Sequence, residues 1–324
     1  MIEKKQRLPV AVFILTFVLL AFVQVKVERP MILAERFIKG GGWVEIFLIS
    51  LYGAFVIDKL QDPANVPKWR KITWTIFSFV FFSQLIIGLS GFEKFLMTGK
   101  LHLPIPMMIL GGPVYRGQLS LMTILFLSTV IITGPAWCSQ LCYFGAFDNL
   151  ASVGKTSMEI LKYKTAIKST VLLLVIAMAL ILRMLKVPGL VSTLLALAFG
   201  IIGITIMILY SMKRKKMVHC VMYCPIGTIV NIFRYINPFR MYIDKSCTLC
   251  MNCTKFCKYD ALNAIDIRNS KPSITCTLCG DCLAGCHHNS IKYKYFNLRP
   301  ELARNLYLIL TISLHASCIA LARI

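Results

Sequence analysis

The chain has 324 residues, of which 57% are apolar and only 15% are charged, and its net charge is +22. Soluble domains are about 45–50% apolar, so this composition excludes a disordered chain, a collagen-like chain and most soluble enzymes. In a water-soluble protein the excess of Lys and Arg would suggest nucleic-acid binding. Here the charges lie between long uncharged runs, which indicates a membrane protein with basic loops and no nucleic-acid partner.

Four uncharged runs are long enough to cross a bilayer, which takes about 20 apolar residues per helix. They are Leu8–Val25, Ile72–Phe92, Gly117–Trp137 and Leu190–Met212. Two further spans are predicted at Gly40–Ile57, which carries Glu45, and at Ser169–Leu182, whose basic flanks can extend to the interface. Asn305–Ala322 is a candidate seventh span. The sequence therefore predicts a membrane all-α helical bundle of six or seven spans.

The first run follows Lys4, Lys5 and Arg7, as the apolar part of a secretory signal would, but it is long and no small-residue cleavage site follows it. We therefore expect a true span with its N-terminus in the cytoplasm, because Lys and Arg are then more frequent in the cytoplasmic loops. In this orientation the clustered cysteines lie on the cytoplasmic side. That compartment is reducing, so metal or cluster ligation is favoured over disulfides.

One predicted outer loop is rich in Pro and Gly, at His102–Pro106 and Gly111–Arg116. This density predicts that the segment forms no regular helix. Two interpretations remain open at this point, a plain structural loop and a quinone pocket.

Two cysteine pairs follow predicted spans at the membrane edge, Cys138 with Cys142 and Cys220 with Cys224, and both segments read C-x3-C-x-[FI]-G-[AT]. Cysteines at i and i+4 share one helix face. Pro225 suits the first turn of a helix, whose positive end would favour a thiolate at Cys224. Together the pairs would offer four sulfurs, either as a third metal or iron–sulfur centre or as two redox dithiols. A lone C-x3-C pair is also compatible with small buried residues.

Residues 240–296 are polar and contain two runs of four cysteines with the spacing C-x2-C-x2-C-x3-C. This is the spacing of bacterial two-cluster ferredoxins, in which the fourth cysteine of each run ligates the other cluster. We therefore expect two [4Fe–4S] clusters with exchanged fourth ligands. The first would be held by Cys247, Cys250, Cys253 and Cys286, and the second by Cys276, Cys279, Cys282 and Cys257.

The alternative for these runs is a pair of zinc sites, but zinc prefers two separated C-x2-C pairs. Ferredoxin runs usually carry Pro after the fourth cysteine, whereas Lys258 and His287 stand there. Since that Pro is not a ligand, ligation should persist. The segment is also basic, and its cations would either raise the potential of an anionic cluster or attract anionic lipid headgroups.

The two C-x3-C motifs followed by a two-cluster segment resemble the membrane polyferredoxin family over residues 70–296, with Tyr143 where that family has Pro. Members include the quinol-dehydrogenase component of periplasmic nitrate reductase systems, the membrane regulator of nitrous oxide respiration and a cytochrome oxidase accessory protein. The resemblance implies electron transfer at a bacterial inner membrane, as a component of a quinol-dehydrogenase type oxidoreductase. It also implies redox roles for the four cysteines of the pairs.

The predicted organisation has three parts. Residues 1–237 form a membrane domain, residues 238–299 a small cytoplasmic α+β ferredoxin domain with two clusters, and residues 300–324 a C-terminal transmembrane helix. The predicted function is electron relay between a quinone, a quinol or another redox subunit of a membrane complex and the cytoplasmic-side clusters. Two alternatives stay open. The chain would be a copper reductase or assembly factor for a respiratory oxidase, with the cysteine pairs as soft-metal ligands, or an iron–sulfur redox sensor.

Overall fold

The computed structural model describes residues 2–28, 30–95, 105–157 and 159–321. Residues 102–104 of the predicted Pro- and Gly-rich loop, and Ala322, lie outside this part of the chain. The chain packs into two compact units, Met1–Leu103 with Arg299–Ile324, and Pro104–Leu298. This packing groups the cysteine-rich segment with the helices before it, and the three-part functional division stays a prediction.

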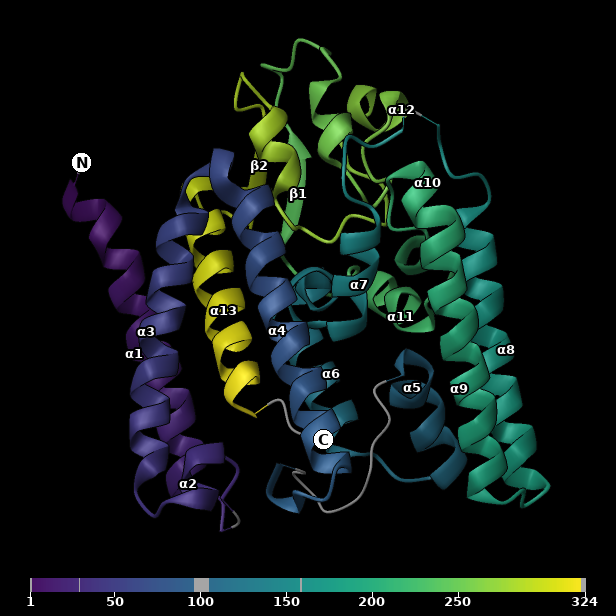
Figure 1. Cartoon of the computed structure of the whole chain (residues 1–324). Helices are drawn as coiled ribbons and strands as arrows, with labels where there is room; N and C mark the ends of the chain where they lie inside the picture. Colours follow the sequence, from purple (N-terminus) through teal and green to yellow (C-terminus); the bar gives the residue numbers. More distant parts are fainter. Residues whose placement is uncertain (1, 29, 96–104, 158, 322–324) are drawn as a thin grey trace. The chain divides into compact units, whose positions relative to one another are not determined.

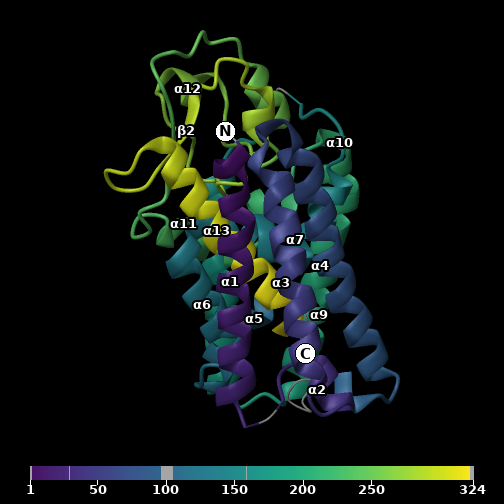
Figure 2. The same cartoon turned by 90° about the vertical axis from the view of Figure 1, so that its left-hand side faces the viewer.

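The first unit is helical. It contains α1 (Ile2–Lys26), α2 (Leu33–Phe37), α3 (Gly41–Gln61), η1 (Pro63–Asn65), α4 (Val66–Leu89), η2 (Glu93–Phe95) and α13 (Pro300–Leu321). Helices α1, α3 and α13 lie side by side (Figures 1 and 2). Their contact is a buried cluster that includes Val12, Val56 and Ile312, all fully buried. The C-terminal helix therefore packs against the helices that begin the chain.

The second unit holds all the cysteines of the predicted sites. Its helical part consists of α5 (Pro106–Arg116), α6 (Leu121–Thr133), η3 (Gly134–Ala136), η4 (Trp137–Leu141), α7 (Tyr143–Ala151), α8 (Lys164–Met184), α9 (Gly189–Ile206), η5 (Met207–Ser211), α10 (Met212–Arg214), η6 (His219–Tyr223) and α11 (Pro225–Phe233). The cysteine-rich part consists of β1 (Arg240–Ile243), η7 (Asn252–Phe256), α12 (Ala264–Arg268), η8 (Asp281–Gly285) and β2 (Ile291–Lys294). Within this unit, the cysteine-rich part lies beyond the end of α8 that carries Lys164 and beyond α10, which continues α9 through η5 (Figure 1).

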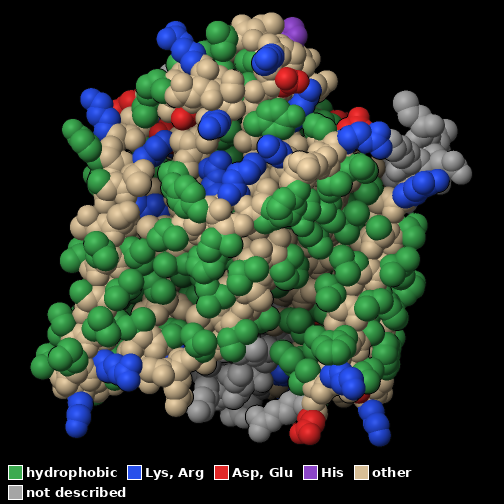
Figure 3. Space-filling view, turned by 180° about the vertical axis from the view of Figure 1, so that it is seen from behind, with side chains coloured by type: hydrophobic (Ala, Val, Ile, Leu, Met, Phe, Trp, Pro, Cys, Tyr) green, Lys and Arg blue, Asp and Glu red, His purple; other side chains and the backbone are tan. Residues whose placement is uncertain are grey.

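Six helices in the described residues are long and apolar enough to cross a membrane. They are Arg7–Lys26, Pro63–Leu89, Met122–Leu141, Lys164–Met184, Gly189–Arg214 and Pro300–Leu321. This is compatible with a multi-pass membrane protein. Hydrophobic side chains cover the middle of the helices on the face drawn in Figure 3, and Lys and Arg gather at the helix ends. Large apolar side chains such as Leu173, Leu194 and Ile201 are more than half exposed, as lipid contact would require.

One predicted span differs from these six. The segment Gly40–Ile57 is a helix, α3, but it is not among the six, whereas the candidate seventh span is. Helix α3 carries Glu45, Asp58 and Lys59, and its crossing of the membrane stays a prediction. The Glu45 carboxylate is already engaged, accepting a hydrogen bond from the backbone N–H of Ala34 at 2.6 Å.

The segment expected to be a loop is also different. Residues Pro106–Arg116 form the helix α5, so the inference from Pro and Gly density is wrong there. Pro106 stands in the first helical turn, where its missing N–H costs nothing. Gly117 closes the helix in a left-handed conformation with φ 71°. Pro106 and Gly117 thus stand at the two ends of α5, whereas Gly111, Gly112 and Pro113 lie inside the helix without breaking it.

The cysteine-rich part is a short sheet with loops on it. Strands β1 and β2 are antiparallel, with Arg240 opposite Lys294 and Ile243 opposite Ile291. Met241, Ile243, Ile291 and Tyr293 alternate inward and are buried. Strand β1 begins the cysteine-rich part and strand β2 ends it, so the two cysteine loops lie between the paired strands in the sequence.

Candidate metal centres

The first set of cysteines assigned to one cluster lies around one hollow. Cys247, Cys250, Cys253 and Cys286 line a cavity of about 360 Å³, counting its part open to solvent. His287 and His288 also line it, and Cys250 is exposed. The fourth cysteine of the second run therefore joins three from the first run.

The second set lies around a second hollow, of about 320 Å³. It is lined by Cys257, Cys276, Cys279 and Cys282, together with the apolar side chains of Met241, Leu262 and Pro272. Here the fourth cysteine of the first run, Cys257, joins the first three cysteines of the second run. The geometry brings together the two groups of four that the spacing predicts.

The two loops have the same backbone. Leu249 and Leu278, the residues before the second cysteine of each run, have φ values of 56° and 57°. Met251 and Gly280, the residues after it, have φ values of 58° and 84°. Left-handed conformations are costly for residues other than Gly, and they persist where the surroundings hold them, commonly at functional sites. Both loops are thus bent so that their three cysteines face one hollow.

The fourth cysteines are oriented alike as well. The N–H of Ala261 donates to Cys257 Sγ at 3.3 Å, and the N–H of Ser290 donates to Cys286 Sγ at 3.2 Å. Hydrogen bonds to cluster sulfurs are one means by which a protein sets the potential of an iron–sulfur centre. These donors lie four residues after each cysteine and were not predicted from the sequence.

The donor set fits an iron–sulfur cluster better than a single ion. Within the described ranges, no group of three or more His, Cys, Asp or Glu side chains is close enough to hold one metal ion. A [4Fe–4S] cube spreads its thiolates, because each binds a different iron. Burial raises the pKa of the Cys257 and Cys282 thiols. Buried thiolates need a compensating positive charge, and iron would supply it to this set.

The membrane-edge motifs form a second structural repeat. Cys138 lies in η4 and Cys220 in η6, and each of these is a five-residue π-helix. Cys142 and Cys224 are the N-caps of the nine-residue helices α7 and α11. Pro225 begins α11 as predicted, and Tyr143 occupies the same position in α7. The Tyr-for-Pro difference therefore leaves the local fold unchanged.

The expectation that each pair shares one face of a continuous helix is wrong. Cys142 and Cys224 have extended ψ values of 109° and 118°, so each chain turns between its two cysteines. A π-helix followed by a capping cysteine places that cysteine at the positive end of the next helix. In α7 the N–H of Gly145 donates to Cys142 Sγ at 3.4 Å.

The four membrane-edge cysteines gather in one place. Cys220 interacts electrostatically with Cys224, Cys142 and Cys138. The carboxyl group of Asp148 also lies here, accepting from the N–H of Cys220 at 2.9 Å. Burial raises the pKa of Asp148 to about 6, although this hydrogen bond acts in the opposite direction. The pseudo-repeat thus supplies four sulfurs beside one buried carboxyl group, which the sequence did not single out.

Direct hydrogen bonds join this group to the second hollow. The Tyr259 hydroxyl donates to the carbonyl of Cys138 at 2.7 Å, and the Ser139 hydroxyl donates to the carbonyl of Thr277 at 3.3 Å. Tyr259 and Thr277 both line the second hollow. On its other side, Cys282 interacts electrostatically with Cys253 of the first hollow. The three cysteine groups are therefore contiguous, with the second hollow in the middle.

A buried ionic cluster fastens the cysteine-rich part to the helix ends. The Asp260 carboxylate pairs with Lys164 at 2.9 Å and with Lys216, and it accepts from the N–H of Leu161 at 3.1 Å. Asp260 is 4% exposed, so water does not screen these charges. None of the three charged residues follows from a motif, because they are far apart in the sequence.

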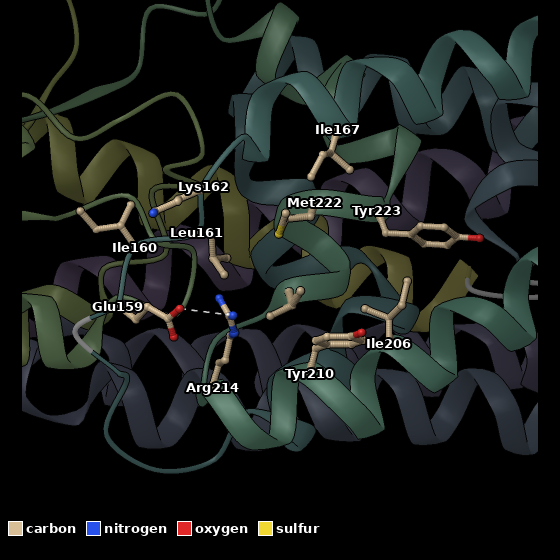
Figure 4. Close-up of a pocket in the computed structure, with 11 residues that line it drawn as sticks. Glu159, Ile160, Leu161, Lys162, Ile167, Ile206, Tyr210, Arg214, Met222 and Tyr223 are labelled. Atoms are coloured by element: carbon tan, nitrogen blue, oxygen red, sulfur yellow. Dashed lines mark ion pairs between the residues drawn. The ribbon is translucent and has the colours of Figure 1, made fainter.

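A pocket of about 870 Å³, counting its open part, lies beside the Cys220–Cys224 motif. Met222 and Tyr223 of η6 line it, with apolar side chains from α8 and α9 such as Ile167 and Ile206 (Figure 4). Glu159 and Arg214 form an ion pair across it at 3.3 Å (Figure 4). The pocket combines apolar walls with a few polar groups, as small-molecule sites do.

The family model described as "4Fe-4S binding domain" matches residues 118–159 and 195–240. These ranges contain both membrane-edge motifs and none of the eight cysteines of the C-x2-C runs. The match covers well under half of the chain, and it supports an iron–sulfur protein of ferredoxin type. Neither the curated proteins nor the solved structures contain a match to this chain.

Proposed function

We propose that the chain is a membrane-bound electron-transfer protein whose three cysteine groups hold three iron–sulfur centres in series. The membrane-edge cysteines form the first centre, the second hollow the middle one, and the first hollow the outermost one. The observation that carries the proposal is the proximity of neighbouring groups. At one junction Tyr259 donates a hydrogen bond to the carbonyl of Cys138, and at the other Cys282 interacts electrostatically with Cys253. A relay needs such proximity, whereas separate structural metal sites do not.

Individual residues can be assigned roles in this function. Each bound cluster would supply a group that accepts and returns one electron. The cysteines hold the centres, the left-handed loop residues aim the thiolates, and the backbone donors at Ala261 and Ser290 stabilise sulfur charge. Apolar residues such as Leu262 exclude water from the middle hollow. Cys250, which is exposed, marks the side of the first hollow from which a partner redox protein would exchange electrons.

At the membrane end we propose a quinone or quinol as the exchange partner. The pocket beside Cys220 and Cys224 has apolar walls formed by α8 and α9, two of the candidate spans. A quinol gives up two electrons and two protons, and a relay of one-electron centres would carry the electrons away singly while water takes the protons. A second pocket lies at the other ends of α8 and α9 and is lined by Tyr115 and Arg116. Unlike the first pocket, it includes no residue of a cysteine motif.

The decisive experiment is anaerobic purification of the full chain in detergent, followed by iron and sulfide analysis and an EPR redox titration. Three four-iron centres give about twelve irons per chain, and two give about eight. In a Cys138→Ser and Cys220→Ser double variant we expect the iron content to fall to that of two centres. A preparation with zinc and no iron, or with no paramagnetic signal after reduction by dithionite, contradicts the proposed function.

The quinol step has its own test. Ile206→Trp should fill the pocket, and we expect it to slow reduction of the clusters by a short-chain quinol at least tenfold while leaving reduction by dithionite unchanged. Ile208→Trp is the matched control, since Ile208 is two residues further along and 56% exposed. Equal rates in the two variants would exclude this pocket as the quinol site.

A further inference from the structure

A buried lysine lies against the membrane-edge cysteines. Lys168, in the second turn of α8, is 4% exposed. A Cβ atom added to Gly227 would lie 2.6 Å from its Nζ and 2.9 Å from its Cε. Gly227 stands in the first turn of α11, three residues after Cys224, so the missing side chain leaves the space that the ammonium group fills. The carbonyl of Lys168 accepts from the Thr228 hydroxyl at 3.1 Å, which fixes α8 against α11.

The charge of this lysine acts on the sulfurs. Lys168 interacts electrostatically with Cys138, Cys224 and Cys220, three of the four membrane-edge cysteines. Its neighbour one turn earlier, Lys164, is paired with Asp260. By contrast, no carboxylate among the described residues forms an ion pair with Lys168. Asp148, the buried acid at the membrane-edge cysteines, accepts instead from the N–H of Cys220.

An unpaired buried cation is costly, because its hydration is lost without replacement. An anionic four-thiolate centre would supply the missing counter-charge. Adding an electron makes such a centre more negative, and a fixed positive charge in a low-dielectric site favours that change. A negative charge on Asp148 would disfavour the added electron. Lys168 and Asp148 therefore act on the reduction potential of the centre in opposite directions.

We propose that Lys168 is a potential-setting residue, whose ammonium group in the space left by Gly227 raises the reduction potential of the centre at Cys138, Cys142, Cys220 and Cys224. This inference rests on the proposed function, since it requires a centre there. It makes the membrane-edge centre easier to reduce than its burial alone would allow, as the entry point of a relay from a quinol must be.

The test is an EPR redox titration of the full chain with Lys168→Met, Lys168→Arg and Lys213→Met. At a fixed ambient potential, Lys168→Met should lower the ratio of reduced to oxidised membrane-edge centre at least tenfold, which for a one-electron couple is about 59 mV. Lys168→Arg should restore most of the ratio. Lys213 is exposed, and its replacement should leave the ratio unchanged. Iron content measured in parallel shows whether each variant keeps its centres.

The outcomes separate the two proposals. If the wild-type chain holds only two centres, the proposed function fails. If it holds the third centre and Lys168→Met leaves the ratio within twofold of wild type, the role of Lys168 is wrong while the relay stands. If Lys168→Met loses the centre, Lys168→Gln is compared with Lys168→Arg. Retention in the arginine variant alone supports a role for the charge, and loss in both overturns it in favour of a purely steric one.

Discussion

At the scale of single residues, Asp260 connects the cysteine-rich part to the helices. It has no place in any cluster motif, yet it pairs with Lys164, which is half-buried at the start of α8, and with Lys216, which is buried just after α10. Its backbone φ of 51° shows that the loop after Cys257 is bent to deliver this carboxylate. The same loop carries Tyr259, so the ionic cluster also positions the hydrogen bond to Cys138.

Asp260→Asn should therefore destabilise this junction. Removing one partner of a buried pair leaves uncompensated charge, which costs about 3–5 kcal/mol. We expect the clusters to be lost at a lower temperature, followed as bleaching of the visible iron–sulfur absorbance on heating. Asp244→Asn is the control, because its pair with Lys292 lies near the surface, where water screens the charges. Equal bleaching temperatures for the two variants would contradict a stabilising role for Asp260.

At the scale of elements, each of the two cysteine loops contributes its fourth cysteine to the hollow lined by the other loop, across η7 and η8. Asn252 Nδ2 of η7 donates to the carbonyl of Gly285 in η8 at 3.1 Å, which holds the loops together. The exchange means that neither loop can assemble its four thiolates alone. The two hollows also differ in their surroundings, because Cys250 of the first is exposed, while in the second Cys257 is half-buried and Cys282 is buried.

This arrangement makes a prediction about single substitutions. Cys286→Ser should weaken the EPR signal of the more exposed centre, although Cys286 belongs to the run whose other three cysteines line the second hollow. Cys257→Ser should do the reverse. Solvent exposure shifts cluster potentials, so the two centres are distinguished by the potential at which each signal develops. If each substitution instead affects the centre of its own run, the ligand exchange is wrong.

The sequence predicts elements well where chemistry repeats at fixed spacing. The C-x2-C runs imply their grouping, and the C-x3-C repeat implies a helix at Pro225, because both depend on local geometry. It fails where a residue type has two uses. Pro and Gly occur at the ends of α5 and inside it as well as in loops, and two cysteines four apart need not lie on one helix. Lys168 and Asp260 could not be found, since only the fold brings Lys168 to the sulfurs and Asp260 to its two lysines.

At the scale of the whole molecule, the unit Pro104–Leu298 has two chemically different ends along α8 and α9. One end carries Lys164, Arg214 and the cysteine-rich part, and the other carries the exposed turn at Leu185 and Lys186. Because loops rich in Lys and Arg remain on the cytoplasmic side, the run from Lys213 to Lys216 predicts that the cysteine-rich end lies there. A quinol-linked relay would then deliver electrons toward the cytoplasm or receive them from it.

Protease access tests this orientation. A short protease site inserted between Ser270 and Lys271, both exposed, should be cut in inside-out membrane vesicles and protected in right-side-out ones. The same site inserted at Lys186 should show the opposite pattern, because the two insertions lie at opposite ends of helices that would cross the bilayer. Iron content confirms that each insertion leaves the centres intact. Reversal of both patterns would place the clusters on the outer side and make an extracytoplasmic partner protein the natural exchange partner of the exposed Cys250 hollow. Cutting of both sites from one side would mean that α8 and α9 do not span the membrane.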